Sequence, residues 1–592
     1  MAGYTEKKRK TVTVKWTDEQ QKVIDLRERN ILVSAAAGSG KTAVLVERIL
    51  QLISEGEHPL NVDELLVVTF TRAAAAQMKD RLIRALEEKL ETDPDNTHLQ
   101  KQTTLIHHAQ ITTIDGFCSY VIRSYFQQID LDPGARVTDE GEQKLLLQDV
   151  LSRTLEEAYE TQTPDFVALA ETLDSGKSDE SLETAVLKLY TLAQSHPWPE
   201  VWLNSCLAPY EAESKEALEQ MPWIGKVEEL TKALLLEAME ANRRGMAVAL
   251  SEHGPGQYVE ALENDRDYME NVAVATGYEN LRTLLLGYKP KALSGKKVPD
   301  VQEEKKLLVQ KERARTKEIL QERIAKAYYS DSLEEVWKKM HQSLPVIRGL
   351  ITLTLHFGEN LAAAKREKNL LDFNDVEHMA LKVLVDRQAD GSEVPTEAAR
   401  ELSSCYAQIM IDEYQDSNLV QEKILTAVSR ERDGQHNLFM VGDVKQSIYK
   451  FRLARPELFM EKYETYTLAD SACQRIDLHK NFRSRREVID SVNCLFARLM
   501  TKPLGGIGYD PSVYLYPGAV WPEAETDCAT ELLMIEKDTE DAKELGSVRE
   551  LEAILAADRI RRMVGREWIT DEETKERRKI RYGDIVILLR SI

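Results

Sequence analysis

A glycine-rich stretch near the N-terminus has the residue types of a phosphate-binding loop. The segment ILVSAAAGSGKT, residues 31–42, runs from apolar through small residues to Gly38-Ser39-Gly40-Lys41-Thr42. A strand, a tight loop and a helix in that order direct backbone N–H groups and a helix N-terminus at anionic oxygens. Lys41 is then suited to bridge β- and γ-phosphates, and the Thr42 hydroxyl to hold Mg²⁺. The spacing predicts a site for a nucleoside triphosphate; a plain small-residue turn is the alternative.

The loop departs from the strict pattern G-x-x-x-x-G-K-[ST] at one position, where Ala35 replaces the first glycine. Alanine still leaves room for the backbone to approach a phosphate, so the prediction stands. The residues expected to contact the triphosphate are Ala35, Ala36, Ala37, Gly38, Ser39, Gly40, Lys41 and Thr42.

An acidic pair follows another apolar run, in QIMIDEYQD at residues 408–416. Ligands of open α/β sheets bind at the carboxyl ends of the strands, where this pair would lie. Asp412 is suited to orient Mg²⁺, and Glu413 to accept a proton from the water that attacks the γ-phosphate. Alone, the pair is equally well explained as plain surface. Together with the phosphate-binding loop, it favours a catalytic interpretation.

A third stretch, VGDVKQSIYKFR at residues 441–452, repeats the order of strand, glycine turn and polar cluster, and then adds aromatic residues. Gln446 is a candidate hydrogen-bond partner for the γ-phosphate or the attacking water. Tyr449 and Phe451 are candidates to stack on bases, which would couple hydrolysis to a nucleic acid. Aromatic residues more often belong to a core, and these residues alone leave that alternative open.

A basic turn, KNFRSRR at residues 480–486, supplies a candidate cation. Arg483 is suited to neutralise charge on the transferring phosphoryl group. The alternative is a solvated basic helix start.

Apolar runs and helical patterns predict the elements that position these residues. Strands alternating with helices predict a parallel α/β sheet. From about residue 137 to 366 the pattern changes to Leu-, Glu-, Lys- and Ala-rich helical spacing, which predicts a helical insertion. Within it, the charged stretch 288–306 is interpreted as an exposed loop, either a solvated face or a DNA contact. Strands are expected at 31–33, 65–70, 111–114, 406–411, 437–441, 475–478 and 580–590.

Composition excludes several classes of protein. The 592 residues are 43% hydrophobic and 30% charged, as in a globular chain without membrane spans, and no apolar run approaches the roughly 18 residues of such a span. The basic N-terminus has no apolar segment typical of a secretory signal. Six scattered cysteines predict free thiols in a reducing cytoplasm. The net charge of −22 argues against a uniformly basic surface, yet it allows a narrow local groove for one nucleic-acid strand.

Taken in order, these stretches resemble the motifs of the UvrD-like superfamily-one DNA helicases. The resemblance covers most of the chain and is far more specific than any one motif. It favours the base-stacking role for Phe451 and the phosphate-binding role for Arg483. The matching segments are 16–20 (Q motif), 35–42 (motif I), 67–75 (Ia), 112–117 (Ib), 412–416 (II), 442–452 (III) and 481–484 (IV).

The resemblance implies roles for individual residues. ATP would bind with Mg²⁺, Gln20 would read the adenine edge, Phe482 would stack on adenine and Arg483 would reach the γ-phosphate. Lys41, Glu413, Gln446 and Arg483 would be the catalytic residues. The residues that would contact DNA are Phe70, Thr71, Arg72, Thr113, Tyr449 and Phe451.

The resemblance also implies a RecA-like P-loop motor domain, a parallel α/β fold interrupted by a large helical insertion and followed by the start of a second RecA-like domain. The expected boundaries are 1–136 for the first part of domain 1A, 137–366 for helical domain 1B, 367–478 for the second part of 1A and 479–592 for the start of 2A. Nothing resembles motif VI or a nuclease site. We therefore expect this sequence to be the N-terminal portion of a longer protein.

Two segments, VSAAAGSGKTAVLVERI and VGDVKQSIYKFRLARPELF, are most similar to the AddA (RexA) type of bacterial helicase-nuclease. Val444-Lys445 and Phe451 depart from the UvrD or Rep pattern of paired aspartates and a tryptophan, and Asp115 stands where many relatives have histidine.

This likeness implies an ATP-dependent 3′-to-5′ DNA helicase in the bacterial cytoplasm, associated with the nucleoid, which processes double-strand breaks. Its partners would be single- and double-stranded DNA and, in a heterodimer, a protein of the AddB (RexB) type. Any nuclease activity would come from a later domain. The alternatives are a stand-alone UvrD- or Rep-type repair helicase and a DNA-binding scaffold switched by ATP.

Overall fold

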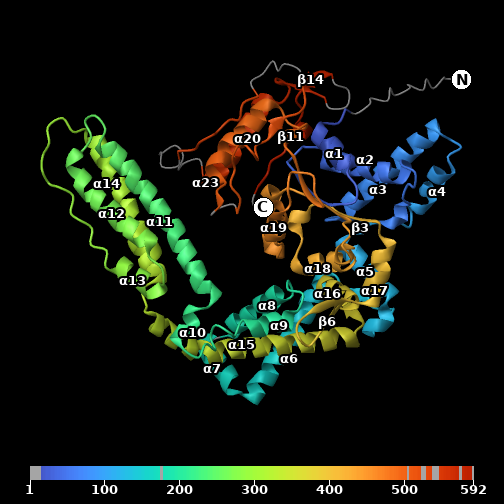
Figure 1. Cartoon of the computed structure of the whole chain (residues 1–592), viewed down its shortest axis with the longest axis horizontal. Helices are drawn as coiled ribbons and strands as arrows, with labels where there is room; N and C mark the ends of the chain where they lie inside the picture. Colours follow the sequence, from blue (N-terminus) through green and yellow to red (C-terminus); the bar gives the residue numbers. More distant parts are fainter. Residues whose placement is uncertain are drawn as a thin grey trace. The chain divides into compact units, whose positions relative to one another are not determined.

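The structure is a computed structural model that describes residues 15–173, 178–502, 506–521, 528–536, 546–571 and 576–589. Most of the basic N-terminal stretch and Arg590 lie outside these ranges. The chain forms two compact units, one of residues 1–135 and 372–592 and the other of residues 136–371 (Figure 1).

The first unit is built on a six-stranded sheet with the order β10-β1-β9-β8-β2-β3, in which every pair of neighbours is parallel. The parallel α/β sheet predicted from the sequence is therefore confirmed. Its strands are β1 (Asn30–Ala35), β2 (Leu65–Thr69), β3 (Gln110–Thr113), β8 (Gln408–Ile411), β9 (Leu438–Gly442) and β10 (Cys473–Leu478).

Both faces of this sheet are covered, which explains why its strands read as continuous apolar runs rather than as alternating ones. Ile31 and Val33 of β1 belong to a core cluster shared with α1 to α4. Leu32 points to the opposite face, since successive side chains of a strand alternate, and it is fully buried too. The helices that precede β10 in this unit are α1 (Asp18–Asp25), α2 (Lys41–Ser54), α3 (Arg72–Thr92), α4 (Thr97–Leu105), α5 (Ile114–Ser124), α16 (Phe373–Leu384), α17 (Glu397–Cys405), α18 (Leu419–Ala427) and α19 (Pro456–Thr465).

The second unit is helical, and its only described strands are the two-residue β4 (Arg136–Val137) and β5 (Leu370–Leu371). A buried ion pair joins Arg313 Nε to Asp265 Oδ2 at 2.7 Å, and Tyr288 donates its hydroxyl to Asp265 Oδ1 at 2.8 Å. These contacts fix the start of the charged loop that was predicted from the sequence. The helices are α6 (Glu140–Thr161), α7 (Pro164–Leu173), α8 (Glu180–Ala193), α9 (Pro199–Ser205), α10 (Lys215–Glu219), α11 (Pro222–Ala249), α12 (Val259–Val274), α13 (Tyr278–Leu286), α14 (Glu303–Glu318) with a π-helical continuation to Lys326, and α15 (Leu333–Glu367).

The stretch after β10 contains shorter elements and one departure from prediction. Residues 585–589, expected within a buried strand, form no strand, and Leu588 is 89% exposed. Within the described residues no neighbouring strand pairs with them, so their apolar side chains remain uncovered. The described elements are β11 (Lys480–Asn481), α20 (Arg486–Leu499), β12 (Tyr516–Pro517), α23 (Val548–Met563), β13 (Trp568–Thr570) and β14 (Arg577–Lys579).

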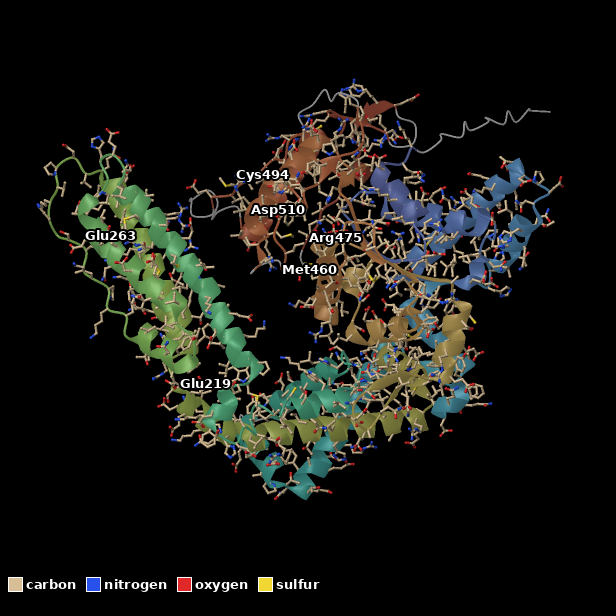
Figure 2. The ribbon with its side chains drawn as sticks, in the orientation of Figure 1. Glu219, Glu263, Met460, Arg475, Cys494 and Asp510 are labelled. Atoms are coloured by element: carbon tan, nitrogen blue, oxygen red, sulfur yellow. The ribbon has the colours of Figure 1, made fainter. Side chains whose placement is uncertain are left out.

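Two predictions from composition concerned the cysteines, which were expected to be free thiols, and membrane-spanning segments, which were not expected. All six cysteines are free thiols, including the exposed Cys494 of α20 (Figure 2). Across the described ranges, no helix is both long and apolar enough to cross a membrane.

Candidate nucleotide and DNA site

The phosphate-binding loop lies between the carboxyl end of β1 and the first turn of α2. Gly38 and Gly40 have φ of +70° and +83°, a left-handed backbone that glycine adopts without strain. Gly40 precedes α2 and no described side chain caps that helix, so its first N–H groups are available to an anion. The Ser39 hydroxyl is buried without a hydrogen-bond partner among the described residues. A triphosphate would satisfy these groups, so the loop fits the predicted ligand.

Alanine at the first loop position has a structural explanation. Ala35 is the last residue of β1, pairs with Leu478 of β10 and is fully buried in the core. The position is part of a regular strand and Ala35 has no positive φ, so this position does not require glycine.

The predicted catalytic acids follow β8 at the same edge of the sheet. Glu413 has φ of +53°, a conformation that a non-glycine residue rarely adopts and that concentrates at functional sites. Its carboxylate meets the Lys41 ammonium, with Nζ 2.9 Å from Oε2 and 3.1 Å from Oε1. The structure thus brings together the phosphate-loop lysine and the candidate base across 372 residues of sequence.

The neighbouring carboxylate, Asp412, is half-buried. Burial raises its pKa to about 6, with a smaller contribution from the charge of Glu413, and Lys41 opposes the shift. A divalent cation would favour the charged form, so Asp412 is suited to the predicted metal role beside Thr42.

A cavity of about 210 Å³ lies next to the loop, between α1 and the segment that follows β10. Gln20 forms one wall, and Phe482 and Tyr516 supply aromatic rings. The size and the aromatic lining suit a nucleobase. Sequence reasoning missed Tyr516, because nothing in its local pattern distinguishes it.

Gln20 connects this cavity with the loop. Its Nε2 donates to the Ser39 carbonyl at 3.0 Å, and its Oε1 accepts from Thr17 N at 3.0 Å in a capping box at the start of α1. A glutamine amide has two N–H donors and two acceptor lone pairs. One donor and one acceptor therefore remain for a ligand.

Motif IV contacts the loop directly. Phe482 N donates to the Gly38 carbonyl at 2.8 Å, and Asn481 Nδ2 donates to the Ala37 carbonyl at 2.8 Å. Asn481 Oδ1 also accepts from the backbone N of Arg483 at 2.9 Å, and the Arg483 side chain is exposed. The predicted cation is thus attached to the loop through a buried asparagine that sequence reasoning did not single out.

The predicted DNA residues divide into two groups. Phe70, Tyr449 and Phe451 form a row of rings, with centroids 4.6 Å apart for the first pair and 5.8 Å for the second, and Phe451 is 75% exposed. Phe451 is therefore not a core residue, whereas Thr113 is buried and its hydroxyl caps α5 by accepting from Gly116 N. Thr71 caps α3 in the same way, and Arg72 begins that helix on the exposed surface.

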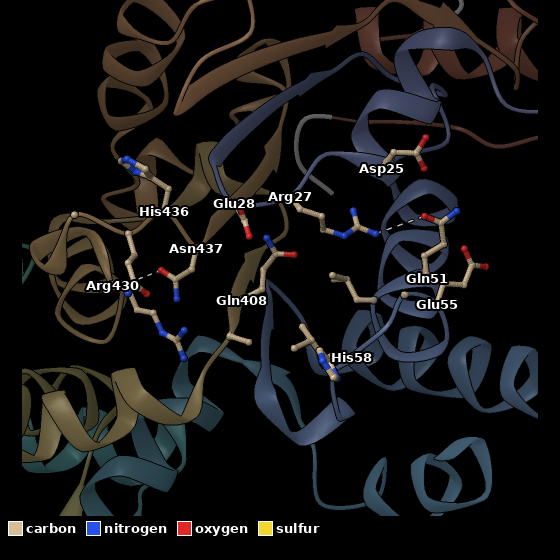
Figure 3. A pocket seen from close by; sticks show the side chains of 16 residues that line it. Asp25, Arg27, Glu28, Gln51, Glu55, His58, Gln408, Arg430, His436 and Asn437 are labelled. Atoms are coloured by element: carbon tan, nitrogen blue, oxygen red, sulfur yellow. Dashed lines mark hydrogen bonds between the residues drawn. The ribbon is translucent and has the colours of Figure 1, made fainter. Parts of the chain in front are cut away.

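A larger cavity, about 930 Å³, lies at the opposite edge of the sheet (Figure 3). Gln408, at the amino end of β8, and Asn437, just before β9, line it. Because all strands are parallel, this edge is remote from the phosphate-binding loop, so the cavity is not the nucleotide site.

Comparison with known proteins agrees with the motif pattern. Residues 16–467 match the family model described as the UvrD/REP helicase N-terminal domain. The chain is 44% identical to the A subunit of the "ATP-dependent helicase/nuclease" of Lachnoclostridium phytofermentans, and 38% identical to the proteins of the same name from Bacillus pumilus and Clostridium beijerinckii. Each match covers 98% of this chain but only 44%, 47% and 48% of the relative, so the chain spans about half the length of these curated relatives.

Proposed function

Because this chain belongs to the UvrD/REP helicase family, we propose that it is the motor part of an ATP-dependent DNA helicase. The observation that carries the proposal is the 2.9 Å contact of Lys41 with Glu413 at the sheet edge where Phe70, Tyr449 and Phe451 also lie. One edge thus carries the groups that we propose bind phosphate, accept a proton and stack on bases.

The proposed hydrolysis follows from these positions. ATP would place its adenine in the cavity between Gln20 and Phe482 and its phosphates on residues 35–42. The Lys41 ammonium would then leave the Glu413 carboxylate and bind the phosphates. The freed carboxylate would accept a proton from the attacking water. Gln446 would orient that water, and Arg483 would neutralise charge on the transferring group. Thr42 and Asp412 would hold Mg²⁺, which supplies charge neutralisation at the phosphates.

The proposed DNA path crosses the carboxyl edge of the sheet. Stacking on the three rings tolerates any base, as a translocase requires. At the N-termini of α3 and α5, the first-turn N–H groups other than those of Ala74 and Gly116, which the Thr71 and Thr113 hydroxyls cap, would face backbone phosphates. We propose domain 1A for residues 1–136 and 367–478, domain 1B for residues 137–366 and the start of 2A for residues 479–592. Opening and closing of the nucleotide site between 1A and 2A would move the strand.

The test of this function is ATP hydrolysis by the full-length protein with and without single-stranded DNA. We expect stimulation by DNA of any sequence, and displacement of an annealed strand that depends on ATP. Hydrolysis that DNA does not stimulate would instead favour the ATP-switched scaffold.

A second expected outcome concerns Phe451. Replacing it with alanine removes an exposed ring, so the affinity for single-stranded DNA should fall by about 1–3 kcal/mol. ATP binding without DNA should be unchanged, because Phe451 does not line the nucleotide cavity. Fluorescence anisotropy of a labelled oligonucleotide measures the first quantity, and Phe373→Ala, at another exposed phenylalanine of the same unit, is the control. Equal DNA affinity in the Phe451 variant and the control would remove Phe451 from the path.

The names of the relatives support a finer proposal. We infer that the protein works as the AddA-type motor of a bacterial helicase-nuclease that processes double-strand breaks, in a heterodimer with a protein of the AddB (RexB) type on DNA in the cytoplasm. Movement in the 3′-to-5′ direction is part of this proposal, and displacement assays with 3′- and 5′-tailed substrates test it. A stand-alone repair helicase would unwind DNA without that second protein.

A further inference from the structure

Gln415 lies two residues after Glu413 and is 1% exposed. Its Nε2 donates to Glu413 Oε2 at 2.9 Å and to Asp416 Oδ2 at 3.3 Å. Its Oε1 accepts from the backbone N of Asp443 at 2.9 Å. One buried amide therefore joins the candidate base to the loop that follows β9.

The path continues through Asp443, which is also 1% exposed. Asp443 Oδ2 accepts from Gln446 Nε2 at 2.9 Å, and Oδ1 pairs with Lys445 Nζ at 2.8 Å. Tyr449 and Phe451 follow on the same segment. A continuous set of hydrogen bonds thus runs from Glu413 to Gln446, next to the stacking rings.

Glu413 depends on its partners for orientation. Within the described ranges, Lys41 and Gln415 are the side chains that donate to its carboxylate. In the proposed reaction Lys41 moves to the phosphates, which leaves Gln415 as the donor.

We propose that Gln415 is a positioning residue that orients Glu413 for proton transfer and makes this orientation depend on the DNA-contacting segment 442–451. The inference rests on the base role proposed for Glu413 and on the DNA contacts proposed for Tyr449 and Phe451. It assigns to Gln415 the link between DNA binding and hydrolysis, while nucleotide binding itself stays with residues 35–42.

Gly442 provides an independent way to disturb the same contact. A Cβ added there would lie 2.4 Å from Gln415 Oε1. Alanine at this position would therefore displace the Gln415 amide. The new methyl group would also lie 3.1 Å from Phe459 Cε2 and 3.3 Å from the backbone N of Gln415, whereas no Glu413 atom is among its three nearest neighbours.

The first experiment replaces Gln415 with leucine, which keeps the volume but removes the hydrogen bonds. In the full-length protein with saturating single-stranded DNA, we expect kcat to fall about 30- to 100-fold because a misplaced base is inefficient. KM for ATP should change by less than about threefold, and the ratio of DNA-stimulated to basal hydrolysis should fall as well. The matched control is Gln102→Leu, at another buried glutamine that accepts from Val62 N at 2.8 Å and is remote in sequence from Glu413 and from segment 442–451.

The second experiment is a double-mutant cycle of Gly442→Ala with Gln415→Ala. Each single variant should lower kcat. The pair should lose clearly less kcat than the two single losses combined, because the amide that collides with the new methyl group is already gone and only the looser contacts with Phe459 and the Gln415 backbone remain. If the losses of kcat in the two single variants add fully in the pair, the contact between position 442 and the Gln415 amide is not the cause of the loss in Gly442→Ala.

The outcomes separate this inference from the proposed function. If Glu413→Gln abolishes DNA-stimulated turnover while Gln415→Leu has the kcat of wild type, only the role of Gln415 is wrong. The same holds if Gln415→Leu and Gln102→Leu lose kcat equally, or if KM rises in parallel with the loss of kcat. If Glu413→Gln keeps wild-type turnover, the base assignment itself fails.

Discussion

Replacing Arg483 with alanine is expected to lower DNA-stimulated ATP hydrolysis by about 10³-fold, the smallest effect usual for a residue that neutralises charge on a transferring phosphoryl group. The side chain is exposed, so its loss leaves no cavity and folding should be unaffected. ATP affinity should change much less than kcat, because the cation acts mainly on charge that develops during transfer. Steady-state hydrolysis and binding of a fluorescent ATP analogue measure the two quantities.

The control for this variant is Arg486→Ala, three residues further along. Arg486 is exposed on the first turn of α20 and is 3.6 Å from Asp490 in a surface ion pair. It has the same charge but, within the described residues, no hydrogen-bonded connection to the phosphate-binding loop. Equal losses in the two variants would mean that general positive charge, rather than a positioned cation, supports hydrolysis.

Replacing Glu413 with glutamine should reduce turnover by about 10²- to 10⁴-fold, since the amide cannot accept the proton of the attacking water. ATP binding should persist, and affinity should rise modestly, because Lys41 no longer has an ionised partner to leave. Single-turnover hydrolysis with rapid quench measures the chemical step, and equilibrium titration measures binding.

Glu55→Gln is the matched control for this second variant. Glu55 also pairs with a lysine, Lys89 at 3.1 Å, but on the surface of the same unit. Wild-type turnover in Glu413→Gln would exclude this carboxylate as the base and would direct attention to Asp412 or Asp416.

Much of the first unit was predictable from local sequence. Its strands lie between two covered faces, so each appears as an uninterrupted apolar run, and all six in the sheet were anticipated to within about two residues. The helical character of residues 140–367 was equally clear from apolar spacing. The strand predicted to include residues 585–589 was wrong, because Ile-Val-Ile-Leu-Leu has the composition of a buried strand. Burial also needs a neighbour, and sequence pattern alone cannot supply one.

The site was predictable as a set of motifs but not as a network. The residue types and spacing of glycines before a lysine, and of acids after a strand, indicate the chemistry that these residues are suited to. The contacts of Gln415 and Asn481 depend on distances between segments that are remote in sequence, so no local pattern reveals them. Thr113 adds a contact of the local kind, because its hydroxyl, which is predicted to contact DNA, also caps α5.

The two hydrogen bonds made by Gln20 also affect the specificity for ATP over GTP. The donor and the acceptor that remain on its amide match the N7 acceptor and the N6 amino group of adenine, whereas guanine presents acceptors at both positions. A guanine in the cavity would set its O6 against the free lone pair of Gln20, at a cost of roughly 1–3 kcal/mol. The same amide donates a hydrogen bond to the Ser39 carbonyl of the phosphate-binding loop. One residue would therefore both discriminate against GTP and stabilise the loop that binds the phosphates.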